Sequence, residues 1–112
     1  ARDQFLRRRL DDDLYAFASE LVAGVRRNRT ELDARLSETA EHWTLSRMAA
    51  TDRNVLRLGA YELLHTDTPE RVVVDEAIEL AKRYGTARSS QFVNGILDRL
   101  MKKTETKDHG TI

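Results

Sequence analysis

Apolar residues recur at helical spacing along most of the chain. After Asp13 they stand three, four or seven positions apart, at Leu14, Phe17, Leu21, Val25, Leu32 and Leu36. This spacing puts them on one face of an α-helix and predicts a single long helix over about residues 13–41. Asp11–Asp13 lie at the predicted start of this helix, where the positive end of the helix dipole stabilises carboxylates. Gly24, in its middle, costs about 1 kcal/mol relative to alanine, which indicates a close neighbour there.

Two shorter helical patterns occupy the middle of the chain. The first is predicted to begin with Thr51 as its N-cap and to run through His65. Pro69 separates this pattern from the next, because proline restricts the residue before it to extended geometry. The second pattern is predicted to start with Asp75 as its N-cap, after an extended entry at residues 72–74. It is predicted to stop at Gly85 in a left-handed conformation.

The last helical pattern is predicted to have Ser89 or Ser90 as its cap and keeps a wide apolar face as far as Met101. Residues 102–112 show no periodicity and are predicted to form a disordered tail. The chain has one proline, five glycines and no long alternation of apolar and polar positions. It is therefore predicted to be all-α, with one helical bundle domain over residues 1–101.

Charge and composition narrow the functional classes. Lys and Arg together number 19, as do Asp and Glu, so the net charge is zero. A protein that binds nucleic acid unaided usually has a basic surplus, so an RNA role here must depend on charge placement or on a partner. The apolar runs are too short to cross a membrane. The lack of cysteine excludes disulfides and thiolate metal sites and fits a reducing cytoplasm.

No catalytic constellation can be recognised in the sequence. The three histidines, His42, His65 and His109, have no ligand-like spacing to one another or to a carboxylate pair. Asp75 and Glu76 are adjacent on a helix, where neighbouring side chains diverge. Glycine-rich phosphate loops and nucleophile motifs are absent as well. We therefore expect a protein that is not an enzyme and that holds neither a metal ion nor a cofactor.

Three segments carry a family resemblance. They read, in order, DRNVLRLGAYELL (residues 52–64), VVVDEAIELAKRYG (72–85) and QFVNGILDRL (91–100). With the segment ELVAGVRRNRTELDARL (20–36), they make the chain resemble the NusB transcription antitermination family over about residues 14–101. The resemblance implies an all-α bundle that pairs with the ribosomal protein NusE and binds boxA RNA. It also implies a place in the antitermination complex on RNA polymerase, notably in ribosomal RNA operons.

Two features of the family shape the expectations further. The same fold also occurs as the first domain of some ribosomal RNA cytosine methyltransferases. The alternative is therefore that the chain is the NusB-like RNA-binding domain of such an enzyme. The family's first two helices, of which the first is Arg-rich and contacts RNA, have no counterpart here, which implies a chain truncated at its amino end. Partner binding is therefore expected to survive better than RNA binding. The uncovered stripe around Phe17 is expected to pair with a second copy as a homodimer, and the alternative is that the helix frays before about Leu21.

The resemblance places RNA contact near Phe92, in the last helix. An exposed aromatic ring can stack on bases, the amide of Asn94 can read a base edge, and Arg26 on the long helix can contact phosphates. The alternative from periodicity is that Phe92 belongs to the core and that Asn94 and Arg26 lie on solvated faces. The simplest explanation of Gly95 is that it lets the helix pack closely.

Candidate residues for the protein partner lie on the two middle helices and just after them. The resemblance puts Asp52, Arg53 and Arg57 at the partner surface. Glu76 is a further candidate on the next helix, and Arg88 is one in the loop before the last helix. The alternative is ordinary helix-dipole and solubility chemistry for these charges.

Overall fold

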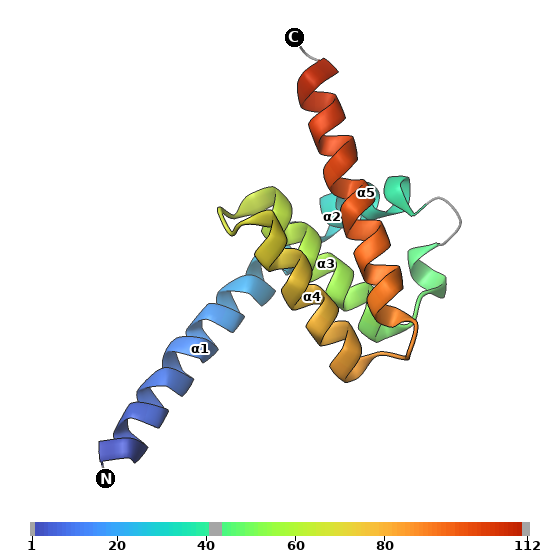
Figure 1. Cartoon of the computed structure of the whole chain (residues 1–112). Helices are drawn as coiled ribbons and strands as arrows, with labels where there is room; N and C mark the ends of the chain where they lie inside the picture. The colour runs from blue at the N-terminus through green and yellow to red at the C-terminus, as the bar shows by residue number, and fades with distance from the viewer. Residues whose placement is uncertain (1, 41–43, 111–112) are drawn as a thin grey trace.

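Helices account for the regular structure of the protein (Figure 1). The computed structural model describes the backbone of residues 2–40 and 44–110, and the side chains of residues 12, 16–40 and 44–104. The helices found there are α1 Arg2–Arg27, α2 Arg29–Thr39, the 3₁₀-helix η1 Leu45–Arg47, α3 Ala50–His65, α4 Glu70–Tyr84 and α5 Ser89–Gly110. No strand is present in these ranges, so the predicted all-α class is confirmed.

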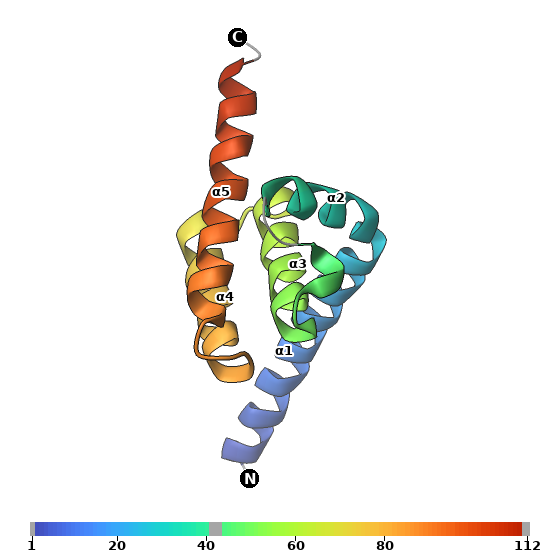
Figure 2. The same cartoon turned by 90° about the vertical axis from the view of Figure 1, so that its right-hand side faces the viewer.

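The predicted long helix over residues 13–41 is in fact two helices. α1 already begins at Arg2, so Asp11–Asp13 lie inside the helix and not at its start. The break is at Asn28, which has φ −108° and ψ 14°. Its side-chain amide donates to the carbonyl oxygen of Gly24 at 2.8 Å, and its backbone N–H donates to the same oxygen at 3.1 Å. Because the side chain competes for a helix carbonyl, the ladder is loosened, and the chain changes direction into α2 (Figure 2).

Helix α4 begins earlier than predicted. Pro69 directly precedes its first residue, where the missing N–H of proline costs no helical hydrogen bond. The predicted extended entry is therefore wrong, because residues 72–74 are helical and Val73 is only 1% exposed. Asp75 lies inside the helix and is not its N-cap.

Two other helix boundaries differ from the predictions, and one agrees. Helix α3 starts at Ala50, so Thr51 lies within the helix and is not its N-cap. Gly85 closes α4 with φ −101°, which is not the left-handed conformation. Helix α5 starts at the predicted place, but Ser89 is its first residue and Ser90 its second, so neither serine is the N-cap. The Ser89 hydroxyl accepts a hydrogen bond from the backbone N–H of Thr86 at 2.8 Å.

Helix α5 continues to Gly110, so the tail predicted to be disordered is helical up to that residue. The last two residues of the chain lie outside the described part. Lys103 Nζ donates to the carbonyl oxygen of Glu38 at 2.6 Å, and Arg35 Nη2 donates to Thr104 Oγ1 at 3.2 Å. These contacts tie the extension to α2. They join residues far apart in the sequence, so the local hydrophobic pattern does not reveal them.

The core lies where α2, α4 and α5 meet around α3 (Figure 2). Its buried side chains come from all four of these helices, and they include Leu32, Leu36, Leu56, Ala60, Ala77, Ala81, Val93, Leu97 and Leu100. Helix α1 packs mainly on α3, and its amino-terminal half extends away from the bundle (Figure 1). Gly24 makes the predicted close approach, because a Cβ there would collide with the ring of Tyr61.

Candidate functional site

Arg57, predicted to face a protein partner, is bound within the chain. Its guanidinium donates from Nε to Asp33 Oδ1 at 2.8 Å and from Nη2 to Asp33 Oδ2 at 3.0 Å. Nη1 also donates to Asn54 Oδ1 at 3.4 Å, and only 11% of the Arg57 side chain is exposed. A bidentate arginine–carboxylate pair is strong and directional. Arg57 therefore holds α3 against α2 and has little surface left for another protein.

Asp52 and Arg53 lie in the first turn of α3. Asp52 is 9% exposed, and its Oδ1 has no hydrogen-bond partner among the described residues. Arg53 is half-buried, and its Nη1 donates to the carbonyl oxygen of Leu45 at 3.1 Å, which ties η1 to α3. Both side chains shape the junction before α3, and part of Arg53 stays accessible.

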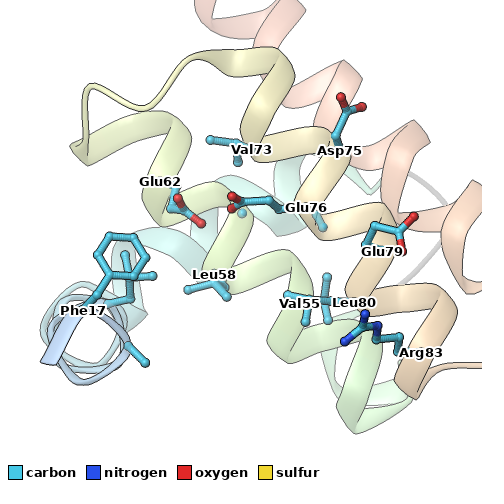
Figure 3. Close-up of a pocket in the computed structure, with 14 residues that line it drawn as sticks. Phe17, Val55, Leu58, Glu62, Val73, Asp75, Glu76, Glu79, Leu80 and Arg83 are labelled. Atoms are coloured by element: carbon cyan, nitrogen blue, oxygen red, sulfur yellow. The ribbon is translucent and has the colours of Figure 1, made fainter. Parts of the chain in front are cut away.

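The other two candidate partner residues are exposed. Arg88 lies in the turn between α4 and α5, at the end of the bundle where α3 begins (Figure 1). Glu76 lies near the middle of α4, and its carboxylate points into a groove (Figure 3). The structure thus places Asp52, Arg53 and Arg88 at one end of the bundle and leaves Glu76 apart from them.

The groove runs between α1, α3 and α4 and has a volume of about 560 Å³ (Figure 3). Its walls are mainly apolar and include Phe17, Leu58, Val73 and Leu80. Phe17 is 54% exposed, so a large apolar side chain is left open to solvent. The residues that line the groove also include four acidic residues and one basic residue, namely Glu62, Asp75, Glu76, Glu79 and Arg83. The carboxylates of Glu62 and Glu76 point toward each other, whereas that of Asp75 points away (Figure 3). Such a groove suits an apolar segment that carries basic residues.

Glu62 is the buried carboxylate of this groove, and the sequence analysis did not identify it. It is 4% exposed, and its side chain lies close to that of Glu76 (Figure 3). Burial, and secondly the charge of Glu76, raise the pKa of Glu62. A signal was present in the sequence, because Glu62 stands at helical spacing from Val55 and Gly59, on the buried face of α3. Charged residues seldom occupy such positions unless they are paired.

The three candidate RNA-binding residues are divided between two places. Phe92, at the start of α5, is half-buried and packs against the core, so both the core role and the base-stacking role remain open to it. Asn94 is exposed nearby on α5, and Arg26 is exposed on α1. Because α3 lies between α1 and α5, the structure does not bring Arg26 together with the other two residues (Figure 2).

Gly95 does not have the packing role predicted for it. It is exposed, and a Cβ built on it would meet nothing within 4 Å among the described residues. By contrast, a Cβ at Gly59 would press on the side chain of Leu97 at 2.9 Å. The prediction that Gly95 allows close helix packing is therefore wrong for the part of the chain that the structure describes.

Metal sites and membrane spans are not found in the described residues. They include no group of three or more His, Cys, Asp or Glu side chains that could hold a metal ion. His65 instead pairs with Glu31, with Nε2 2.9 Å from Oε1, and its ring stacks on that of Tyr61. As far as they are described, the helices also lack the unbroken apolar length that a bilayer span requires.

Known proteins resemble this chain over most of its length. The transcription antitermination protein NusB of Geobacter sp. (strain M21) is 48% identical over 95 residues, which is 84% of this chain and 66% of the relative. The NusB protein of Thermotoga sp. (strain RQ2) is 50% identical over 92 residues, which is 81% of this chain and 65% of the relative. The chain thus spans about two thirds of the length of these relatives.

Two solved structures share the fold. A NusB structure from T. maritima is 50% identical in sequence, with a TM-score of 0.74, over 78% of this chain and 62% of that one. A chain in the crystal structure of a plectonemic RNA supercoil is 30% identical, with a TM-score of 0.78, over 84% of this chain and 69% of that one. The family model for NusB matches residues 1–102. With this match and relatives that are about half identical, the chain belongs to the NusB family.

Proposed function

We propose that the chain acts in transcription antitermination, as an adaptor that pairs with a NusE-type ribosomal protein and binds boxA-like RNA. The observation that carries the proposal is its 48% and 50% identity to two curated NusB antitermination proteins. The role is one of binding, not of catalysis. In this role the protein would act in the cytoplasm, together with RNA polymerase, on nascent transcripts of ribosomal RNA operons.

The proposed RNA surface is centred on the first turns of α5. Phe92 is half-buried at the start of α5, and stacking of one base on an aromatic side chain contributes about 1–3 kcal/mol. The exposed amide of Asn94 has the donor and acceptor groups needed to read a base edge. Arg26 lies beyond α3, so it would contact a different part of the RNA strand. Because the net charge is zero, the proposal assigns part of the RNA affinity to the ribosomal-protein partner.

The proposed protein surface is the end of the bundle formed by the start of α3 and the turn between α4 and α5. Arg53 and Arg88 present positive charge there, and Asp52 adds a buried carboxylate with one oxygen unpaired among the described residues. Glu76 extends this surface along α4. Arg57 contributes indirectly, since its two bonds to Asp33 hold α3 in place against α2.

Titration with both ligands tests the proposal. The 112-residue chain is titrated with a purified NusE-type protein by calorimetry, and the complex is then titrated with labelled boxA and scrambled oligonucleotides by fluorescence anisotropy. We expect a one-to-one heterodimer, a preference for boxA, and weaker RNA binding by the chain alone. Phe92→Ala is expected to weaken RNA binding by the complex about 5- to 100-fold, because a stacking platform is lost.

A matched variant separates this effect from general damage to the fold. Phe17→Ala also removes an accessible aromatic ring, but from α1, and is expected to leave the RNA affinity of the complex unchanged. Equal affinity of the complex for boxA and scrambled RNA would contradict the RNA part of the proposal. Failure to form any heterodimer would contradict the part that concerns the ribosomal protein.

We also propose that α1 mediates self-association, with a second copy of the chain occupying the groove. Phe17 and Val22 on α1 are 54% and 51% exposed. The groove beside α1 is mainly apolar, and its lining has four acidic residues and one basic residue, whereas residues 1–10 include four arginines and one aspartate. The basic amino-terminal turns of one copy and the groove of the other are therefore complementary in charge. A two-fold arrangement would satisfy both grooves at once.

A further inference from the structure

Gly95 is an exposed glycine inside a helix, and nothing in the described structure requires a glycine there. A Cβ would meet no atom within 4 Å, and no described glycine has a positive φ. Glycine inside a helix lowers stability by about 1 kcal/mol relative to alanine. Gly95 therefore weakens α5 without a packing or conformational benefit among the described residues. A benefit of glycine at this position would arise only when a ligand is bound to α5.

The residues that share this face of α5 have the chemistry of a surface for single-stranded nucleic acid. Phe92 stands three positions before Gly95, and Arg99 stands four after it. Residues at these spacings line up along one side of a helix. Arg99 is exposed, and its side chain has no hydrogen bond or ion pair with the described residues. The face thus presents an aromatic ring, bare backbone and a cation, in that order.

The charge balance of this face favours RNA over an acidic or neutral protein segment. Asp98, the exposed carboxylate beside it, is paired with Lys102, with Oδ2 3.1 Å from Nζ. The negative charge of Asp98 is therefore matched within α5, while Arg99 is left for a ligand. Proteins hold flexible single strands with aromatic rings on which bases stack and with cations that contact the phosphates.

We propose that Gly95 is the point at which the RNA strand rests directly on the backbone of α5. This inference rests on the RNA binding proposed above and adds a residue and a mode of contact to it. Phe92 is half-buried and packs against the core, so a base can contact it only if the sugar–phosphate chain passes close to the helix. A methyl group would keep other heavy atoms about 3.5–4.0 Å from its carbon. Glycine removes that barrier, and Arg99, one helical turn further along α5, then binds a neighbouring phosphate.

Gly95→Ala tests the inference, because stability and binding should move in opposite directions. The midpoint of thermal unfolding is expected to rise by about 4–8 °C, since alanine favours the helix and meets no obstacle. The affinity of the complex with the NusE-type protein for boxA RNA is expected to fall about tenfold. Its affinity for the NusE-type protein itself is expected to stay unchanged.

Thr30→Ala is the matched control. It also places alanine at an exposed helical position, on α2, and should raise the unfolding midpoint without changing the RNA affinity. If Gly95→Ala raises the midpoint and leaves the RNA affinity unchanged, the inference is wrong. A lower midpoint would show that the glycine has a packing role and would overturn it as well. Loss of binding to the NusE-type protein would assign the bare backbone to the protein partner instead.

Arg99 provides a second, independent measurement. Arg99→Gln should reduce the slope of log affinity against log salt concentration by about one, because it removes one phosphate contact. An unchanged slope would overturn the assignment of this face to RNA. If the wild-type complex does not bind boxA RNA at all, the proposed function itself fails. A defect confined to Gly95→Ala would leave the proposed function standing and support the inference.

Discussion

At the scale of single residues, Glu62 shows how the groove is built at a cost in free energy. Its carboxylate is buried on α3 and lies near that of Glu76 on α4. Burial and like charge both disfavour the ionised form, and both raise the pKa of Glu62. The folded protein therefore keeps a proton on Glu62 at pH values where the unfolded chain has already released it.

Glu62→Gln is expected to raise the free energy of unfolding at neutral pH and to flatten its dependence on pH. In the wild type, the contribution of Glu62 is most favourable below its ordinary pKa, where the carboxyl group is protonated in both states. That contribution is lost as the pH rises through the raised pKa of the folded state. Glutamine has a similar shape and no charge to bury. Urea denaturation at a series of pH values from about 4 to about 8 measures the effect.

Glu79→Gln is the control for this prediction, because it removes an exposed carboxylate from the same groove. Its pH profile should follow that of the wild type. A Glu62→Gln protein that is less stable than the wild type at neutral pH would show that the charged form makes a favourable contact, and the prediction would fail.

At the scale of helices, one glycine decides how α1 lies on α3. Gly24 stands where the ring of Tyr61 approaches the backbone of α1, and that ring also stacks on His65, with centroids 5.4 Å apart. A few residues later, Asn28 divides α1 from α2. The close approach and the bend together allow α2 to reach the core while most of α1 remains outside it.

Gly24→Ala is therefore expected to destabilise the protein, although alanine is the better helix former. The new Cβ would overlap the ring of Tyr61, and overpacking of this kind costs about 1–3 kcal/mol. Chemical denaturation followed by circular dichroism measures the change. Gly95→Ala, in open space on α5, is the matched comparison and should shift stability the opposite way. A stabilising Gly24→Ala would mean that Tyr61 moves aside at little cost.

At the scale of the whole molecule, α1 leaves apolar surface open that the bundle does not cover. Its first half extends from the body, and Phe17 lies beside the groove (Figures 1 and 3). Apolar surface of this kind, next to a lining of carboxylates, is typical of a contact with another protein surface. The proposed second copy would bring both the apolar residues and the arginines of its own α1.

Phe17→Glu is expected to weaken self-association about 30-fold or more, because it adds a negative charge to an acidic groove and removes an apolar contact. Light scattering across a concentration series measures the dissociation constant. Tyr84→Glu, at a position that is 67% exposed and does not line the groove, should leave association unchanged. A wild-type chain that stays monomeric at the highest concentration would contradict the proposal.

Charge exchange provides a second check on the same contact. A chain with Arg7, Arg8 and Arg9 changed to Glu, and a chain with Glu76 and Glu79 changed to Lys, should each associate poorly alone. When they are mixed, the basic α1 of the second chain meets the acidic groove of the first, and the acidic α1 meets the basic groove. Recovery of association only in the mixture is the expected result.

The sequence by itself determined the helical class, the start of α5, the close approach at Gly24 and the family. Apolar spacing, helix propensity and motif order are local properties, so the linear pattern contains them. The same local pattern wrongly predicted α1 and α2 as one helix and placed the start of α4 too late. The competing hydrogen bond of Asn28 and the helix start after Pro69 change the pattern of apolar positions very little.

Only the tertiary structure decided which charged and polar groups are used inside the molecule. Arg57 is bound by Asp33, which is 24 positions away, and Lys103 and Thr104 of α5 are tied to α2 by bonds that span 65 and 69 positions. The buried state of Glu62 and the open space at Gly95 likewise depend on which helices lie opposite them. Periodicity records which face of a helix is apolar, but the partner of that face, or its absence, is determined by the packing of distant segments.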